Sequence, residues 1–267
     1  MIHEKKMAIG IIPLLFMAIL LSSQVYAYTF TSDFSKGFYW QSFPIKMNEF
    51  VTDAKDGVLL DELTSQAEQE WEDAVGKNIW DINSFQVTTS FLGNYIKWSD
   101  DFGNETGYDP SKTLAITIRY NQGTNFQQTV IILNGSLSYL RQNFGNSLKT
   151  TILHEMGHTL GLDHSEVNAI MAANLSSFST LQPDDIEGIN AVVNETINRQ
   201  STHYISPYST GSVENKRLVP TCGTTEDVGN TQDPKNGTRN FIGSLLIGFI
   251  ISGYLNPRRK GIYSVRY

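Results

Sequence analysis

The sequence predicts an α+β fold, in which an early helix, several strands and two late helices follow one another along the chain. Residues 59–75 carry apolar side chains at helical spacing, and such a stripe marks the buried face of an amphipathic helix. Three later segments alternate apolar and polar residues as strands do, at residues 85–91, 114–120 and 129–133. This order of elements favours one domain with a sheet and packed helices.

The early helix is predicted from six apolar residues that share one helical face. They are Leu59, Leu63, Ala67, Trp71, Ala74 and Val75. We assign these residues to packing rather than to chemistry, because an apolar stripe at this spacing is nearly always part of a core.

Residues 154–164 carry the functional prediction. His154 and His158 are four residues apart, so on a helix both imidazoles project from one face and can share a metal ion. Glu155 lies beside them and can act as a general base toward a water molecule that zinc has acidified. Gly161 can adopt the left-handed conformation that ends a helix, and the resulting turn brings His164 to the same ion. Three neutral imidazoles leave a fourth tetrahedral position open, as in catalytic zinc sites.

The shorter pattern His-Glu-x-x-His alone is a modest signal, because a helix can carry these residues on a solvated face. The longer pattern also fixes Gly161 and His164, and it holds three of the five histidines in the chain. We therefore predict a zinc site with His154, His158 and His164 as ligands and Glu155 as the catalytic base.

Around these residues the chain resembles the metzincin metallopeptidases, whose signature continues to a methionine-containing turn beneath the metal. Met171 lies seven residues after His164, at the place of this Met-turn, although methionine is also a common core residue. Residues 161–165 are similar to the matrixin branch in particular. The resemblance implies a twisted mixed β-sheet, an active-site helix and a C-terminal helix after the Met-turn, and we expect this matrixin-like catalytic domain over residues 28–197.

Two flanking segments extend the resemblance to about residues 38–195. Residues 40–47 are similar to the first strand of the family, and residues 181–189 are similar to the start of its last helix. Pro183 and the acidic residues after it also suit the first turn of a helix.

Several departures from the family pattern limit what the resemblance implies. Many matrixins have a propeptide whose cysteine caps the zinc, but here the single cysteine, Cys222, follows the catalytic region, so the control of activity is not predicted. Cys222 is a weak metal candidate, and a free thiol, a lipid-modified thiol and a bond to another chain stay open. Ala172, Ala173 and Asn174 replace the tyrosine and proline that often line the specificity pocket, so neither cleavage preference nor natural substrate is predicted.

Calcium is a second cofactor that the family suggests. Residues 99–109 offer oxygen ligands of the kind that calcium prefers, on a loop. Their Asp, Asn and Gly residues are also ordinary turn formers, so a solvated turn explains the segment as well.

The N-terminal segment predicts export. Lys5 and Lys6 precede an apolar run at residues 8–21, and Ala27 supplies a small residue before a cut, as in a signal peptide over residues 1–27. An uncleaved membrane anchor is the alternative, but the run is shorter than the ~20 residues of a bilayer span.

The C-terminal segment predicts a tether to the membrane or cell surface. Residues 241–257 form a hydrophobic anchor or sorting segment, and residues 258–267 form a basic tail that suits the cytoplasmic side. The arrangement resembles bacterial sorting signals that a processing enzyme removes, which favours a bacterial source, and a buried core helix is a further alternative. Together with the signal peptide, the tether predicts an extracellular or periplasmic location for the catalytic domain.

Residues 198–240 are rich in Ser, Thr, Asn and Gly and are expected to form a flexible polar linker. The chain has a net charge of −7, and it is more acidic without its two terminal segments, which hold six basic residues and one acidic residue. The expected partners are therefore protein or peptide substrates and the membrane, not nucleic acid. One cysteine provides no internal disulfide, and the oligomeric state is not predicted.

These observations lead to one expected function and two alternatives. The expected function is hydrolysis of peptide bonds in proteins by a secreted or membrane-tethered zinc endopeptidase, with Glu155 as general base. An antiparallel edge strand would bind the substrate as an added strand, although the sequence does not show which strand forms the edge. A catalytically silent binding or adhesion module would not need Glu155, and a surface structural protein would not need the zinc ligands.

Overall fold

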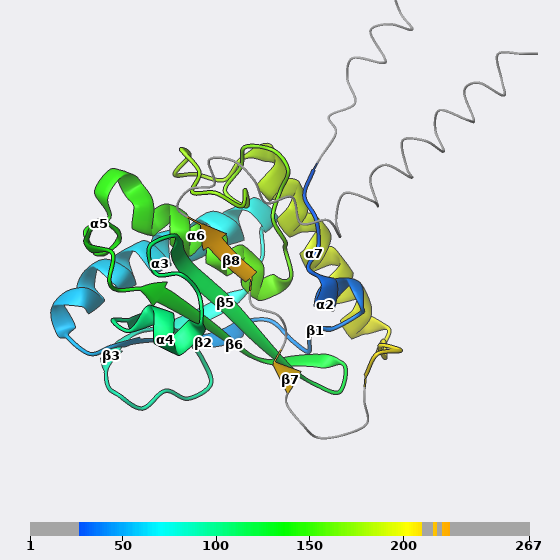
Figure 1. The fold of residues 1–267 in the computed structure, drawn as a ribbon. Coiled ribbons are helices and arrows are strands. Elements are labelled where there is room, and N and C mark those ends of the chain that lie inside the picture. The colour runs from blue at the N-terminus through cyan, green and yellow to red at the C-terminus, as the bar shows by residue number, and fades with distance from the viewer. Residues whose placement is uncertain (1–26, 210–215, 218–220, 225–267) are drawn as a thin grey trace, which may run out of the picture. The chain divides into compact units, whose positions relative to one another are not determined.

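A computed structural model describes residues 27–209, 216–217 and 221–224, which form a mixed sheet with helices packed against it (Figure 1). The main strands are β2 (Ile45–Val51), β3 (Trp80–Val87), β4 (Asn94–Ser99), β5 (Thr113–Gln122) and β6 (Asn125–Asn134). Their order is β3-β2-β4-β6-β5, in which β5 runs antiparallel to β6 and the other neighbours are parallel. The predicted mixed sheet and α+β fold are confirmed.

Three short strands complete the sheet, namely β1 (Tyr39–Trp40), β7 (Lys216–Arg217) and β8 (Thr221–Thr224). β1 pairs with β6, whereas β7 and β8 pair with β5 along the edge that β6 does not occupy. Part of the range 198–240, for which we expected a linker, thus contributes two strands to the described structure. Strands of two and four residues are too short for alternation to be visible in the sequence.

The helices are α2 (Ser32–Ser35), α3 (Ala54–Val75), α4 (Phe102–Thr106), α5 (Ser138–Arg141), α6 (Ser147–Leu160), α7 (Pro183–Ser201) and the 3₁₀ helix η1 (Phe144–Asn146). Helix α3 begins after Asp53, whose side chain accepts a hydrogen bond from the main-chain nitrogen of Lys55, and it ends at Gly76 with φ of 63°. Leu63, Ala67 and Trp71 of the predicted stripe are buried, which confirms the helix and its inward face.

The strand predictions differ from the structure at their boundaries. Residues 114–120 and 129–133 lie within β5 and β6, but residues 85–91 overlap only the end of β3. The strand expected at residues 40–47 is divided between β1 and β2. β4 was missed because Lys97 interrupts its apolar pattern, although the structure buries Lys97 beside Glu105.

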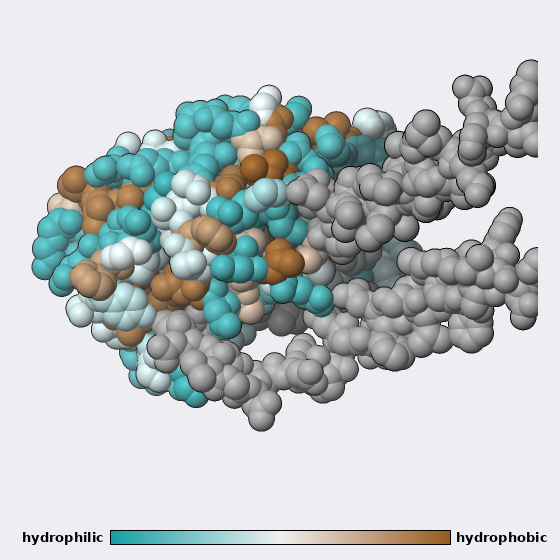
Figure 2. All heavy atoms as spheres, turned by 90° about the horizontal axis from the view of Figure 1, so that it is seen from above, coloured by the Kyte–Doolittle hydropathy of each residue, from teal (hydrophilic) through white to brown (hydrophobic). Residues whose placement is uncertain are grey.

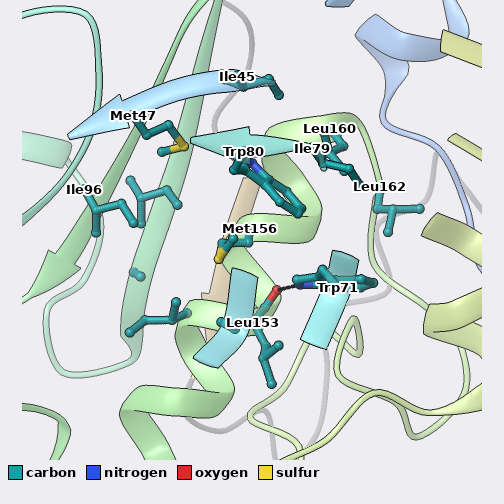
Figure 3. Close-up of a cluster of buried hydrophobic side chains, with 14 of the residues drawn as sticks. Ile45, Met47, Trp71, Ile79, Trp80, Ile96, Leu153, Met156, Leu160 and Leu162 are labelled. Carbon is teal, nitrogen blue, oxygen red and sulfur yellow. Dashed lines mark hydrogen bonds between the residues drawn. The ribbon is translucent and has the colours of Figure 1, made fainter. Parts of the chain in front are cut away.

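The core lies between the sheet and helices α3 and α6, and Figure 3 shows its centre. The Trp71 indole donates to the main-chain oxygen of Leu153 at 3.0 Å. The Trp80 indole donates to Thr159 Oγ1 at 3.2 Å. Both indoles are buried, so each bond satisfies a donor that has no access to water. These contacts hold α6 against α3 and the sheet.

Figure 2 shows one face on which hydrophilic and hydrophobic residues are interspersed. Within the described part of the chain, no helix is both long enough and apolar enough to cross a bilayer. Three predicted segments lie outside the described residues. They are the signal peptide expected at residues 1–27, of which only Ala27 is described, the hydrophobic segment 241–257 and the basic tail 258–267.

Candidate metal centre and active site

Helix α6 places two predicted zinc ligands and the predicted base inside the molecule. His154 is 5% exposed, and Glu155 and His158 are fully buried. Helix α6 packs on β5 and α3, so these side chains lie between the helix and its neighbours rather than on a solvated face. The alternative of a solvated His-Glu-x-x-His helix is therefore wrong.

Gly161 turns the chain directly after α6. Its φ is 112°, a left-handed conformation that favours glycine, and its main-chain nitrogen donates to the carbonyl oxygen of His158. A Cβ atom at Gly161 would also lie only 2.8 Å from the Phe34 side chain. The turn expected from the sequence is present, and it directs the chain toward His164.

The three predicted ligands come together in the structure. One ligand nitrogen from each of His154, His158 and His164 lies within 4.8 Å of the other two. The Nε2 atoms of His154 and His158 face each other at 2.9 Å. Two nitrogen ligands of one tetrahedral zinc ion would be roughly 3.3 Å apart for bonds of ~2.0–2.1 Å, so the donor set and its spacing fit zinc.

Hydrogen bonds orient two of the imidazoles. His154 Nδ1 lies 2.7 Å from the carbonyl oxygen of Ile170, and His158 Nδ1 lies 2.7 Å from that of Leu162. Because a carbonyl oxygen only accepts, these bonds assign the proton to Nδ1 and leave the Nε2 lone pair for a metal.

The same two imidazoles are neutral at pH 7. Burial, reinforced by the neighbouring ring of His164, lowers the pKa of His154 to about 3. Burial and the other two imidazoles likewise hold the pKa of His158 well below its ordinary value. Metal ligands must be deprotonated, so the environment provides the binding form of each ring.

Thr117 on β5 holds the carboxylate of Glu155. The Thr117 hydroxyl lies 2.5 Å from Glu155 Oε2 and 3.2 Å from the main-chain oxygen of Glu155, and both residues are fully buried. We did not identify Thr117 from the sequence, because the polar positions of an alternating strand are expected to face solvent. Here β5 is buried on both faces, and the polar position supports the site.

Met171 lies in a turn that packs against α6, as the Met-turn prediction requires. The main-chain nitrogen of Ser165 donates to the carbonyl oxygen of Met171 at 2.7 Å, which closes the turn. The main-chain nitrogens of Ile170 and Met171 each donate to the Asp185 carboxylate at 2.9 Å. Asp185, which we assigned to the helix dipole alone, therefore also fixes the turn from the start of α7.

A second carboxylate from α7 supports the segment after His164. Asp184 accepts a hydrogen bond from the Ser165 hydroxyl at 2.7 Å and from the main-chain nitrogen of Tyr28 at 3.1 Å. The first turn of α7 thus ties the N-terminal end of the domain to the residue that follows the third ligand.

A buried ion pair lies at the end of α6 and was not predicted. Arg119 on β5 donates to the carbonyl oxygen of His158, and its guanidinium lies 2.7 Å from the Asp33 carboxylate. Arg119 is 2% exposed and Asp33 6% exposed. A cation beside the last carbonyls of a helix is favourable, so Arg119 caps the helix that carries the ligands.

A pocket opens beside His154 and Glu155. Its other lining residues come from β5, from α6 and from the segment on either side of Met171: Leu114, Thr150, Thr151, Ile170, Ala172, Asn174, Leu175 and Ser176. Ala172 and Asn174, which belong to the segment where the family often has tyrosine and proline, therefore form part of its wall.

The loop expected to hold calcium gives that prediction no support. Asp100 pairs with Arg141, Glu105 with Lys97, and Asp109 accepts hydrogen bonds from Ser111. Within the described ranges, the three histidines are the only group of three or more His, Cys, Asp or Glu residues with metal-binding geometry.

The match to a known protein family agrees with the geometry. The matrixin peptidase family model matches residues 61–193. A solved structure, archaemetzincin from Methanopyrus kandleri, shares 12% identity with a TM-score of 0.35, covering 57% of this chain and 96% of the archaeal one. No curated protein matches the chain.

Proposed function

Because residues 61–193 belong to the matrixin family of metzincin zinc metallopeptidases, we propose that this chain is an endopeptidase in which Glu155 is the general base. One observation carries the proposal. The Glu155 carboxylate is buried and held by Thr117, and Glu155 lines the same pocket as the ligand His154. A silent binding module has no need of a carboxylate fixed at this place.

Each residue of the site has a defined part in peptide hydrolysis. Zinc bound by His154, His158 and His164 would polarise the scissile carbonyl and lower the pKa of water. Glu155 takes the proton from the attacking water and gives it to the departing amine. Thr117 keeps the carboxylate oriented for both transfers, because its hydroxyl bonds one of the two oxygens.

The experiment compares the full-length chain with its Glu155→Gln variant on a diverse peptide library, with zinc content measured on the same samples. We expect zinc near one ion per chain in both proteins and a loss of kcat/KM of roughly a hundredfold to ten-thousandfold in the variant. The matched control is Glu62→Gln, at an exposed position of α3, which should retain full turnover. Bound zinc with no turnover in any protein would favour the silent module, and undiminished turnover in Glu155→Gln would refute the assignment.

We also propose that the domain is exported and tethered by its C-terminal segment. Support comes from the apolar run at residues 8–21, the small residue Ala27, and the hydrophobic and basic segments at the other end. Cleavage after Ala27 would place the new ammonium group of Tyr28 beside the Asp184 carboxylate, a favourable position. N-terminal sequencing and membrane fractionation test both parts, since a mature chain that begins at Met1, or a freely soluble one, would contradict them.

A further inference from the structure

The outer edge of β5 is occupied by the chain's own C-terminal part. β8 pairs antiparallel with β5, with Thr221 opposite Thr117 and Cys222 opposite Ile116. The pairing continues with Gly223 opposite Ala115. β7 extends the same edge farther along β5, and Figure 1 shows β8 alongside β5 next to α6.

This edge is also where an extended substrate would have to bind. Thr117 of β5 bonds the Glu155 carboxylate, and Leu114 of β5 lines the pocket beside His154 and Glu155. A peptide added along this part of β5 would therefore run past the predicted base and ligands, with main-chain hydrogen bonds providing affinity. The sheet's other edge, β3, is separated from β5 by β2, β4 and β6.

We propose that β8 is a built-in competitor of the substrate, which holds the peptide-binding edge of β5 until an extended peptide displaces it. The inference rests on the proposed function, because it names the regulation of the same site. Residues 113–117 of β5 cannot pair with β8 and with a substrate strand at once, since one strand edge accepts one partner.

The composition of β8 suits a partner that can be displaced. Its four residues, Thr-Cys-Gly-Thr, are small, and only four residues pair, so the contact is short. A tether within the same chain compensates for weak pairing, because it holds the segment at an effective concentration in the millimolar range. Main-chain pairing, rather than the thiol of Cys222, is what the proposal requires.

Two adjacent prolines test the pairing in the full-length chain. Main-chain N–H groups of an antiparallel strand alternate in direction, so one of any two consecutive residues donates toward the partner. The double variant Cys222→Pro/Gly223→Pro therefore removes a donor to β5 whichever residue provides it, and proline is poorly tolerated in such a ladder. The matched control Cys222→Ala/Gly223→Ala removes the thiol and the glycine but keeps both donors.

Binding is measured in the Glu155→Gln background, so that the result does not depend on turnover. The probe is fluorescein-labelled unfolded casein, followed by fluorescence anisotropy. We expect the proline variant to bind roughly tenfold more tightly than the alanine variant, because it lacks the tethered competitor. Equal affinity of the two variants would overturn the proposal.

Turnover of the same casein with Glu155 intact judges the proposed function separately. Absence of turnover in every variant would refute the proposed peptidase activity, while the difference in binding would still decide the role of β8.

If the proline variant does not fold, amide hydrogen exchange on the unmodified chain tests the pairing of β8 with β5 instead. The amides in residues 114–117 that point away from β6 should exchange slowly, and fast exchange at these alternate positions would overturn the proposal.

Discussion

Met171 packs so closely on Gly157 of the ligand helix that there is no room for a side chain at residue 157. A Cβ atom at that position would lie 2.5 Å from Met171 Sδ and 3.3 Å from a Trp71 ring carbon. The turn below the histidines and the middle of α6 are thus in direct contact, one residue before His158. A change that separates them would therefore act on the part of α6 that carries the ligands.

Gly157→Ala should therefore destabilise the domain, although alanine favours a helix more than glycine does. We expect overpacking to cost about 1–3 kcal/mol in the free energy of unfolding, measured by urea denaturation. The same substitution in a Met171→Ala background should cost less, because the closest atoms are absent. Equal costs in both backgrounds would show that the contact with Met171 does not cause the loss.

Thr117→Val should lower kcat with little change in KM. Valine has nearly the same shape but no hydroxyl, so the Glu155 carboxylate loses the bond that orients it. We expect a decrease in kcat of about tenfold, a fraction of the full contribution of a general base. Thr117→Ser keeps the hydroxyl and should retain most of the activity, with zinc content unchanged in both variants. A loss of zinc in Thr117→Val would instead indicate a general structural defect.

Glu49 should make the domain less stable as the pH rises. Burial, with the nearby carboxylates of Asp61 and Glu68, raises the pKa of Glu49 from 4.5 to about 8. Between these values the unfolded chain has an ionised Glu49 while the folded chain keeps it protonated, so the free energy of unfolding falls with pH. The slope from this group approaches about 1.4 kcal/mol per pH unit and vanishes above the folded pKa.

Glu49→Gln should remove this part of the pH dependence. Glutamine cannot ionise, so urea unfolding measured at several pH values between about 5 and about 8 should show a flatter profile than the parent chain. Burial also raises the pKa of Glu68, to about 7, so a smaller slope should persist. Glu62→Gln, at an exposed position of α3, is the control and should leave the profile unchanged. An unaltered slope in Glu49→Gln would contradict the assignment to Glu49.

The sequence predicted those parts of the site whose geometry is local. His154, Glu155 and His158 lie on one helix, and Gly161 ends it, so residue spacing alone places them relative to one another. The α3 stripe and the start of α7 at Pro183 were predicted for the same reason.

The parts that were missed depend on contacts between distant segments. Thr117 reaches Glu155 over 38 positions of the chain, and Asp185 reaches the main chain of Met171 over 14. Nothing in the pattern of either segment marks the partner, because a threonine in a strand and an aspartate in a first helical turn have ordinary local explanations. The pairing of β8 with β5 is of the same kind, since it joins segments about a hundred residues apart.

Asp33→Asn should be strongly destabilising, because it leaves the Arg119 guanidinium buried without a counter-charge. Breaking one partner of such a pair costs about 3–5 kcal/mol, which urea denaturation would detect. The double variant Asp33→Asn/Arg119→Met should recover part of that loss, since it removes the unpaired charge. Lys55→Met, which breaks an exposed pair with Asp53, is the control and should change stability little.

Arg119→Met should also weaken zinc binding. This effect distinguishes the contact of Arg119 with the end of α6 from its contribution to the overall stability of the fold. The guanidinium donates to the carbonyl oxygen of His158, so its removal loosens the last turn of the ligand helix and the turn at Gly161. Asp33→Asn keeps that donor and should retain zinc better than Arg119→Met does, measured by competition with a chelator. Equal zinc affinities in the two variants would mean that the ion pair supports the fold but not the position of the ligands.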